Sequence, residues 1–598
     1  MYRRILALLV ISIALATVHL HAQEDGAAAL PLGKKLIEYG WDVPFPDFVR
    51  DHIREMEQRP FDGLIFKLRG GGKVLTPTAW DPAQFEQDYE TVQQIAWDRF
   101  THNFVIMWAA SEQDWFDDAQ WEAIENNVRL MAKAARLAKC VGVCFYAEPY
   151  GANPWVYGKA AHHDTKTFAE YQAMVRQRGA QFIRAVEQEL PNPHILTFFQ
   201  LSYFSRLCVP MPPEERAGKL SHLSYGLLPA FLNGMLDGAG PGVRIIDGNE
   251  SAYYYTEKEQ YIEEYHLVRQ RARYMIDPAL WDKYRVQVDV GQALYIDQYF
   301  GLRTHNVLGH YMTPEDRPKW FEHNVYWALY SADSYVWCYS ERMNWWKDEA
   351  VPPGCEEALR SARDKLASGK PLGLDVASVI AEARQREKDA LAHNLKEVTS
   401  EIIRLAADAP QPTIDGKLDD PAWEKVGPLD PFAPVASMPD SLEAATHARV
   451  ACGQQGLFIA FRCDEPDPAK MQIVGENRDD YVFGGEVVEI FIAPGGKSPW
   501  CYQFAVNPNG VFWDAAHGEL MDTGYNPAWT CAAFIGAAFW SVEAAIPWAA
   551  LGMSYPEPGA QIHANLCRER NRALELTAWS PPIRLFLEPE HFGTWVFK

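Results

Sequence analysis

A glutamate at the end of an apolar run is the first candidate for chemistry in this sequence. Residues 141–151 read VGVCFYAEPYG, so strand-forming residues lead directly to Glu148, and the Pro-Tyr-Gly that follows stops the strand. Phe145, Tyr146 and Tyr150 lie beside it in sequence and would withdraw its carboxyl group from water, which favours the protonated form. A carboxyl group held in this form can donate a proton, so Glu148 is predicted to be a general acid.

A second carboxyl group is needed if this chemistry is the cleavage of a glycosidic bond. The two groups lie about 5 to 5.5 Å apart for retention of configuration and about 6.5 to 9.5 Å apart for inversion. Glu341 ends the apolar run 334–341 and precedes RMNWW, while Asp247 and Glu250 close the run VRIIDGNE. We rank these partners in the order Glu341, Asp247, Glu250, because Asp247 directly follows the apolar residues and Glu250 lies further into the predicted loop.

Other side chains near the same strand ends could contact a sugar. The candidates are Asp42, Lys67, Trp108, Tyr150, Trp345 and Trp346. Aromatic rings stack on the apolar faces of sugars, and acidic or basic side chains bind their hydroxyl groups. Asp42 and Lys67 could instead neutralise each other across adjacent strands.

Eight apolar runs alternate with segments of helical periodicity, and these elements must bring the candidate residues together. The predicted strands are 36–42, 63–68, 104–109, 141–148, 195–200, 243–250, 306–312 and 334–341. The predicted helices are 47–58, 83–98, 118–139, 167–190, 223–237, 256–276, 317–332 and 354–367. Strands that are apolar along their whole length are buried on both faces, as in a parallel sheet covered by helices. Residues 30–370 are therefore predicted to form a (β/α)8 barrel, with its chemistry at the carboxyl ends of the strands.

The composition narrows the class of ligand. The formal net charge is -23, and aromatic residues make up 13% of the chain, with 21 Trp and 27 Tyr. An acidic chain lacks the clustered basic face that nucleic acid or an anionic membrane surface requires, whereas a neutral carbohydrate suits the aromatic content. Adjacent His162 and His163 lack the spacing of a zinc site, and no HExxH motif occurs, so no catalytic metal or other catalytic cofactor is expected.

The N-terminus predicts export. Two arginines precede the apolar run 5–18, and small Ala22 ends a short polar region, so residues 1–22 are interpreted as a signal peptide and the protein as secreted or periplasmic. No later run is continuously apolar over about 18 residues, so no membrane insertion is expected. Cys452 and Cys463 flank a predicted strand and could pair in an oxidising compartment.

Beyond the barrel the composition changes twice. Residues 371–410 are charged and rich in alanine, which predicts a helical linker. From 411 to 598, short apolar runs such as 456–463 and 487–494 are separated by Gly, Pro, Asn and Asp. This spacing is typical of an antiparallel β-sandwich.

The C-terminal region also carries the motifs of a known family. TIDGKLDDPAW (413–423), EVVEIFIAP, FAVNPNG, SVEAAIPWAALG and TAWSPP (577–582) occur in this order before a closing HFGTWVF. In this combination the region resembles the family 9 carbohydrate-binding modules, which are β-sandwiches. The resemblance implies that the domain binds the ends of sugar chains between Trp rings, with Trp579 in such a position, and that it holds structural calcium.

The barrel is similar to glycoside hydrolases of the eight-stranded barrel type, without a motif of one family. The Asn-Glu pair that ends strand four in the large clan with two glutamates is absent, because Ala147 precedes Glu148. The prediction is a secreted glycoside hydrolase that acts on a poly- or oligosaccharide through carboxylate acid/base catalysis, with an appended carbohydrate-binding domain. Two alternatives stay open: a non-catalytic glycan-binding protein, and a polysaccharide lyase, which would use a base and a neutralising cation.

Overall fold

The computed structural model describes most of the chain after the predicted signal peptide. The described residues are 33–109, 111–149, 152–303, 307–391, 395, 398–406, 408–429, 431–436, 442–497, 500–518, 521–522, 524–573 and 575–598. Residues 1–22, the predicted signal peptide, lie outside them. No helix in the described part of the chain has both the length and the apolar character needed to cross a membrane.

The N-terminal part is built on a parallel sheet, nine-stranded within the described residues. In spatial order its strands are β7 (Val288–Val290), β6 (Arg244–Asp247), β5 (His194–Thr197), β4 (Gly142–Tyr146), β3 (Phe104–Trp108), β2 (Gly63–Phe66), β1 (Lys35–Gly40), β9 (Tyr335–Ser340) and β8 (Gln292–Tyr295). Only Gly291 separates β7 from β8, so the sheet closes on itself through the continuous segment 288–295. The N-terminal part therefore has the predicted barrel class.

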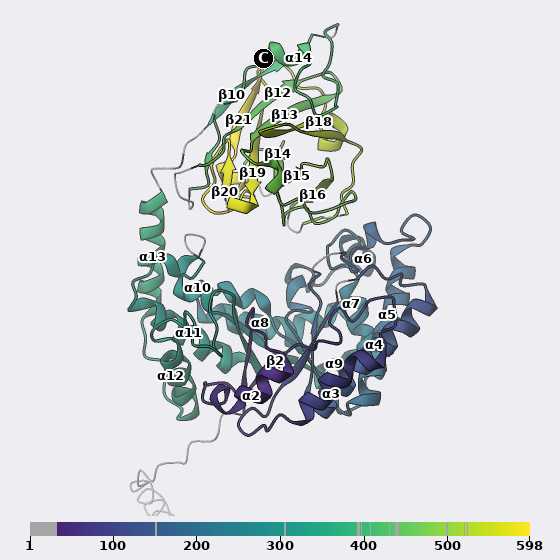
Figure 1. Ribbon diagram of the computed structural model, residues 1–598, viewed down its shortest axis with the longest axis vertical. Helices are drawn as coiled ribbons and strands as arrows, with labels where there is room; N and C mark the ends of the chain where they lie inside the picture. Colours follow the sequence, from purple (N-terminus) through teal and green to yellow (C-terminus); the bar gives the residue numbers. More distant parts are fainter. Residues whose placement is uncertain are drawn as a thin grey trace, which may run out of the picture.

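Helices surround this sheet (Figure 1). They are α2 (Pro46–Met56), α3 (Glu86–Gln93), α4 (Asp118–Leu137), α5 (Phe168–Glu189), α6 (Pro213–Leu220), α7 (Leu228–Gly238), α8 (Lys258–His266), α9 (Trp281–Gln287), α10 (Ile296–Phe300), α11 (Asp316–Ser331) and α12 (Cys355–Ala367). In α4, buried Trp121, Ile124, Val128 and Met131 recur every three or four residues and form one apolar face. Asp117 caps this helix by accepting hydrogen bonds from the first backbone N–H groups.

The seventh strand was predicted in the wrong place. The predicted strand 306–312 corresponds to a 3-10 turn, η9 (Leu308–Tyr311), and the chain enters the sheet earlier, through 288–295. Periodicity alone cannot tell whether a short, continuously apolar run forms a strand or a buried turn. A Cβ atom at Gly309 would lie 2.3 Å from the Gln298 carbonyl oxygen, which shows how closely this turn packs against α10. Asp289 and Gly291 interrupt the true strand, which hid its apolar character.

The C-terminal part is a mostly-strand domain, hereafter the β domain. In the described residues, its sheet runs in the order β16 (Phe512–His517), β15 (Cys501–Val506), β14 (Val487–Ala493), β19 (Gln561–Arg570), β21 (Gly593–Phe597), β10 (Thr399–Arg404), β12 (Thr446–Cys452), β13 (Gly456–Asp464), β18 (Phe539–Pro547) and β17 (Thr530–Ile535). Two further strands, β20 (Glu575–Ala578) and β11 (Ala433–Pro434), extend from β19. Both halves of this path contribute to one buried cluster, for example Ile490 and Phe504 from one half and Ile459 and Trp540 from the other. The strand-rich class is confirmed, and the two layers of a sandwich stay a prediction.

The predicted helical linker 371–410 is only partly helical. Helix α13 (Val376–Leu391) occupies its first half, but β10 is a strand that pairs in parallel with both β21 and β12. The run TSEIIR has one fully buried residue, Ile402, and its charged residues gave it a helical appearance. Pairing on both sides outweighs this local preference. The boundaries of the folding units stay a prediction.

Cys452 and Cys463, which could pair according to the sequence, do not form a disulfide. In the β12–β13 ladder Cys463 lies opposite Thr446, and Cys452 lies opposite Leu457, so the two residues are at opposite ends of the hairpin. Both are buried free thiols.

The place of β10 predicts how the β domain responds to truncation. A fragment of residues 392–598 retains β10, whereas 411–598 lacks it and leaves β12 and β21 without their shared neighbour. We expect the longer fragment to unfold cooperatively and the shorter one to melt at least about 10 °C lower, because a central strand contributes several kcal/mol. Thermal unfolding followed by circular dichroism compares the two. Equal melting temperatures would place β10 outside the cooperative unit.

Candidate active site

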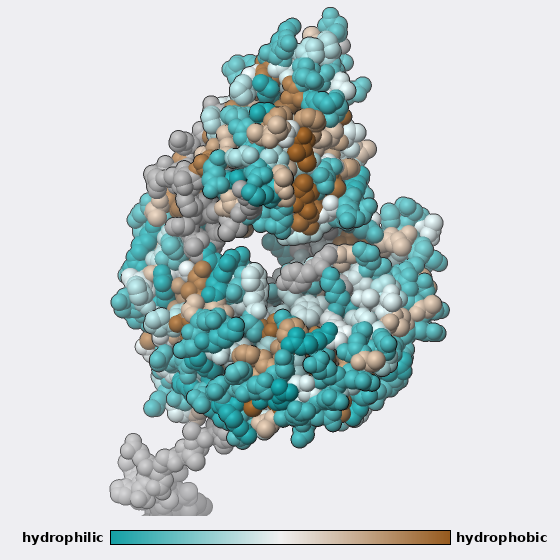
Figure 2. All heavy atoms as spheres, in the orientation of Figure 1, coloured by the Kyte–Doolittle hydropathy of each residue, from teal (hydrophilic) through white to brown (hydrophobic). Residues whose placement is uncertain are grey.

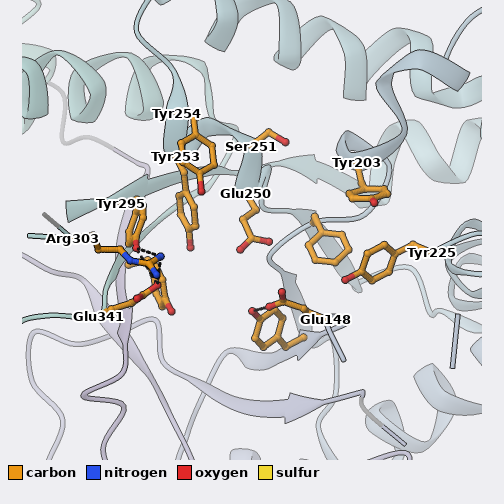
Figure 3. Close-up of a pocket in the computed structure, with 13 residues that line it drawn as sticks. Glu148, Tyr203, Tyr225, Glu250, Ser251, Tyr253, Tyr254, Tyr295, Arg303 and Glu341 are labelled. Carbon is orange, nitrogen blue, oxygen red and sulfur yellow. Dashed lines mark hydrogen bonds and ion pairs between the residues drawn. The ribbon is translucent and has the colours of Figure 1, made fainter. Parts of the chain in front are cut away.

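A cavity of about 400 Å³ lies where the barrel strands end. It is lined by Tyr146, Glu148, Phe199, Tyr203, Tyr225, Glu250, Ser251, Tyr253, Tyr254, Tyr295, Arg303, Tyr339 and Glu341. Glu148 follows β4, Glu250 follows β6 and Glu341 follows β9, so loops from three strands converge here. Figure 3 shows these carboxyl groups around one space, with tyrosine rings beside them.

The loop that carries Glu148 is fixed from both sides. The Tyr146 hydroxyl donates a hydrogen bond to Oε2 of Glu148. The Ala147 carbonyl accepts a hydrogen bond of 2.7 Å from the buried indole of Trp155. The predicted position of Glu148, at the point where strand becomes loop, places its carboxyl group in the cavity.

Glu250 faces Glu148 across this space (Figure 3). It begins the 3-10 turn η4 (Glu250–Tyr254), and its backbone N–H donates to the Phe198 carbonyl at 3.0 Å. The preceding Asn249 adopts a left-handed conformation with φ 44°, which turns the chain back toward the cavity. Burial, and to a smaller degree the charge of Glu148, raises the pKa of Glu250 to about 8.

Glu341 lies at another side of the cavity, beside a cation. Its Oε1 accepts a hydrogen bond of 3.0 Å from the Tyr295 hydroxyl and lies 3.6 Å from Nη1 of Arg303. Its backbone N–H, like that of Arg342, donates to the carboxylate of Asp297. Burial raises the pKa of Asp297 to about 6.

Asp247, ranked second among the partners, does not line the cavity. Its buried carboxylate accepts hydrogen bonds from the backbone N–H of Gln200 and from both the backbone and the hydroxyl of Ser202. Burial raises its pKa. Asp247 therefore fixes the loop after β5, and the ranking that placed it above Glu250 is not supported by its position.

Five of the predicted sugar contacts also lie outside the cavity lining: Asp42, Lys67, Trp108, Trp345 and Trp346. Half-buried Asp42 accepts a hydrogen bond from the Trp345 backbone N–H at 2.9 Å, and desolvation of its carboxyl group raises its pKa. Among the described residues no ion pair joins Lys67 to Asp42, and the Lys67 ammonium group lies 4.6 Å from the centre of the Phe45 ring. Tyr150 lies outside the described residues.

The two tryptophans after Glu341 serve packing instead. Trp345 is fully buried, with its ring 5.2 Å from that of Phe61, and Trp346 packs against Phe61 and Phe100. The position of a ring beside a carboxylate in sequence did not predict its direction in space.

Trp579 lies in the core of the β domain. It is 1% exposed, and its ring centre is 6.2 Å from that of Trp595. In this position no face of the ring is available to a sugar. The described residues contain no group of three or more His, Cys, Asp or Glu side chains arranged to hold a metal, and the structural calcium implied by the resemblance stays a prediction.

Sequence reasoning missed most of the aromatic lining and its cation. Tyr253 and Tyr254 belong to the tyrosine run that follows IIDGNE after two small residues, which was a usable signal. Tyr295 ends the strand 292–295, which was not recognised as a strand, and Arg303 lies in the segment after it. Once that strand is placed, its end at Tyr295 falls at the same rim as Glu341.

Comparisons with known proteins give distant matches. No protein-family model matches the chain, and no similar curated protein was found. A Bacteroides uniformis protein described as carbohydrate-binding matches 34% of this chain and 100% of its own, with 16% identity and a TM-score of 0.28. A family 9 carbohydrate-binding module of Caldicellulosiruptor kristjanssonii in complex with glucose matches 33% of this chain and 95% of its own, with 13% identity and a TM-score of 0.26.

A chitinase of glycoside hydrolase family 18 from Pseudoalteromonas aurantia matches 55% of this chain and 100% of its own, with 10% identity and a TM-score of 0.28. The two classes that the sequence resembles are thus both represented among the similar structures.

The burial of Trp579 predicts a stability effect. Trp579→Ala should lower the free energy of unfolding by about 3 to 5 kcal/mol, because it removes a large ring from a packed core. Urea unfolding of the full chain measures this change. Trp500→Ala, which removes a 61% exposed ring of the same domain, should change stability by less than about 1 kcal/mol. Wild-type stability of Trp579→Ala together with weaker sugar binding would restore the role that the resemblance implies.

Proposed function

We propose that this protein hydrolyses glycosidic bonds in a poly- or oligosaccharide, with Glu250 as the proton donor. The observation that carries the proposal is the position of Glu250, which faces Glu148 across the cavity (Figure 3), and burial there raises its pKa to about 8. A carboxyl group that keeps its proton at neutral pH, opposite a second carboxyl group, is the arrangement that glycoside cleavage requires.

The two groups then take different roles. Glu250 protonates the glycosidic oxygen as the bond breaks, and Glu148 acts as the nucleophile or activates a water molecule. Glu148 suits the second role because the Tyr146 hydroxyl donates to its carboxylate and can hold it in position. The general-acid role predicted for Glu148 from sequence therefore passes to Glu250.

The rest of the lining suits a neutral sugar. Rings of Tyr203, Tyr225 and Phe199 contact one another at centre distances of 4.8 and 4.9 Å and form one wall of the cavity. Such rings bind the apolar faces of sugars while their hydroxyl groups bind polar edges. The N-terminal residues 1–22 support export, so the substrate would be met in the periplasm or outside the cell.

Arg303 is the observation that favours a polysaccharide lyase, because a cation could neutralise the acidic group of a uronic acid. Its guanidinium group already lies 3.6 Å from Glu341 and donates to the Tyr295 hydroxyl at 3.2 Å. In the lining that the structure describes, three carboxyl groups accompany this one guanidinium group, which disfavours an anionic substrate. The hydrolase is therefore the better supported function.

Substitution of the two glutamates tests the roles. Glu250→Gln should lower the rate on a natural oligosaccharide by about 10² to 10⁴ and largely spare an activated aryl glycoside, whose leaving group needs no proton. Glu148→Gln should abolish both reactions. The substrates are cello-, xylo- and chito-oligosaccharides, assayed for reducing ends and for the unsaturated products that a lyase would release.

Glu264→Gln is the matched control. The pKa of Glu264 is also raised to about 8 by burial, but this residue does not line the cavity, so its substitution should leave the rate unchanged. Full activity of Glu250→Gln on the natural oligosaccharide would remove Glu250 from the mechanism. Binding of the oligosaccharides without any cleavage by the wild-type chain would instead indicate the non-catalytic binding protein.

The pKa of Glu250 also predicts the pH dependence. Below about 8 the acid holds its proton, and above that value the protonated fraction falls about tenfold per pH unit. We therefore expect kcat/KM on a natural oligosaccharide to decrease above about pH 8, with a weaker decrease on the aryl glycoside. A profile of kcat/KM against pH, with the fold checked by circular dichroism, measures this limb. A flat profile to about pH 10 would contradict the assignment.

A further inference from the structure

The β domain contacts the barrel beside the cavity. Nζ of Lys159 lies 3.2 Å from Oδ1 of Asp479 of the β domain. Nδ1 of His222 lies 3.3 Å from Oδ2 of Asp522, and the backbone of Leu223 forms a bridge with the same residue. Figure 1 shows the β15 and β16 end of the β domain directed toward the barrel.

The barrel residues in these contacts belong to the loops that build the cavity. Lys159 ends the turn η2 (Tyr157–Lys159), in the connection after β4 that also carries Glu148. His222 and Leu223 lie close in sequence to Tyr225, a lining residue. The β domain therefore meets the rim of the candidate active site, and Figure 2 shows an opening between the two parts of the molecule.

The loop of the β domain at this rim is held in place. Oδ2 of Asp480 accepts hydrogen bonds from the backbone N–H groups of Glu476 and Asn477, both at 2.8 Å. The Asp479 backbone N–H donates to the Phe512 carbonyl at 2.9 Å, and Asp479 adopts a left-handed conformation with φ 68°. A non-glycine residue keeps this conformation only where its surroundings enforce it.

Tyr481, the residue after Asp480, is 60% exposed. Behind it, Phe483 contacts its ring edge-on at 5.7 Å, and Trp513 contacts Phe483 at 4.9 Å, so the exposed ring rests on other aromatic side chains. Partial burial, the charge of Glu569 and then that of Glu148 raise the pKa of Tyr481. Tyr481 lies two residues after Asp479, whose carboxylate contacts Lys159 of the barrel, so its loop lies at the barrel side of the opening.

We propose that Tyr481 is a sugar-binding subsite of the barrel cavity, so that the cleft for a glycan chain is built by both domains. It would stack on a sugar residue beyond those held between Glu148 and Glu250. A ring that is exposed on one face, supported from behind and carried by a fixed loop is suited to this contact. The inference rests on the proposed function and extends it to a preference for longer chains.

Chain length provides the test. In the full-length protein, Tyr481→Ala should lower kcat/KM for a hexasaccharide by about 10-fold and leave kcat/KM for an aryl monoglycoside unchanged. Tyr481→Phe keeps the ring and should retain most of the hexasaccharide activity. Phe534→Ala is the control, because it removes a 38% exposed ring of β17 that contacts Phe539 of its own domain.

The outcomes separate this inference from the proposed function. Suppose that Glu250→Gln is inactive on the hexasaccharide. If Tyr481→Ala then lowers activity on long and short substrates equally, or changes activity on neither of them, the subsite is wrong and the proposed function stands. If the protein binds the oligosaccharides but does not cleave them, calorimetry with the disaccharide and the hexasaccharide provides the test. Weaker binding of the hexasaccharide alone by Tyr481→Ala would support the subsite, and equal affinities of both variants for the hexasaccharide would contradict it. If none of the cello-, xylo- or chito-oligosaccharides is bound or cleaved, both are overturned.

Discussion

Closure of the parallel sheet is the constraint on which the candidate site depends. β7 pairs with β6, β8 pairs with β9, and Gly291 alone joins them, so one extended segment completes the ring. A Cβ atom at Gly291 would lie 2.9 Å from Cγ2 of Ile246 and 3.1 Å from the Asp247 carbonyl, which leaves little room for a side chain. Because parallel strands end on the same side, closure brings Glu148, Glu250 and Glu341 to one cavity.

The parts of the site that depend on one strand end could be predicted from sequence. Glu148 is an example, because an apolar run followed by Pro fixes both the strand and its end. The order of Asp247 and Glu250 could not be predicted, because it depends on the left-handed Asn249 and the 3-10 turn that follows. Asp247, the last residue of β6, becomes an anchor for backbone N–H groups, and Glu250, three positions later, reaches the cavity.

Aromatic residues were the least predictable part. Trp345 and Trp579 occur in sequence contexts that suggest sugar binding, yet both rings fill cores. Tyr481 and Tyr295, which lie at the opening and in the cavity, have no local signal, because their positions follow from the contact between domains and from a strand broken by Gly291. Local periodicity predicts which residues are buried along one element, but not which distant elements meet. The same limit explains β10, whose pairing partners lie far along the chain.

The pairing of β10 with β21 has a consequence for biosynthesis. Residues 399–404 are made well before their partner, residues 593–597, which is among the last segments to be made. The centre of the second sheet therefore stays open until translation ends, whereas the barrel can close as soon as β9 has emerged. During that interval the edges of β10 and β12 are exposed to other chains, and a chaperone or the finished barrel would have to protect them.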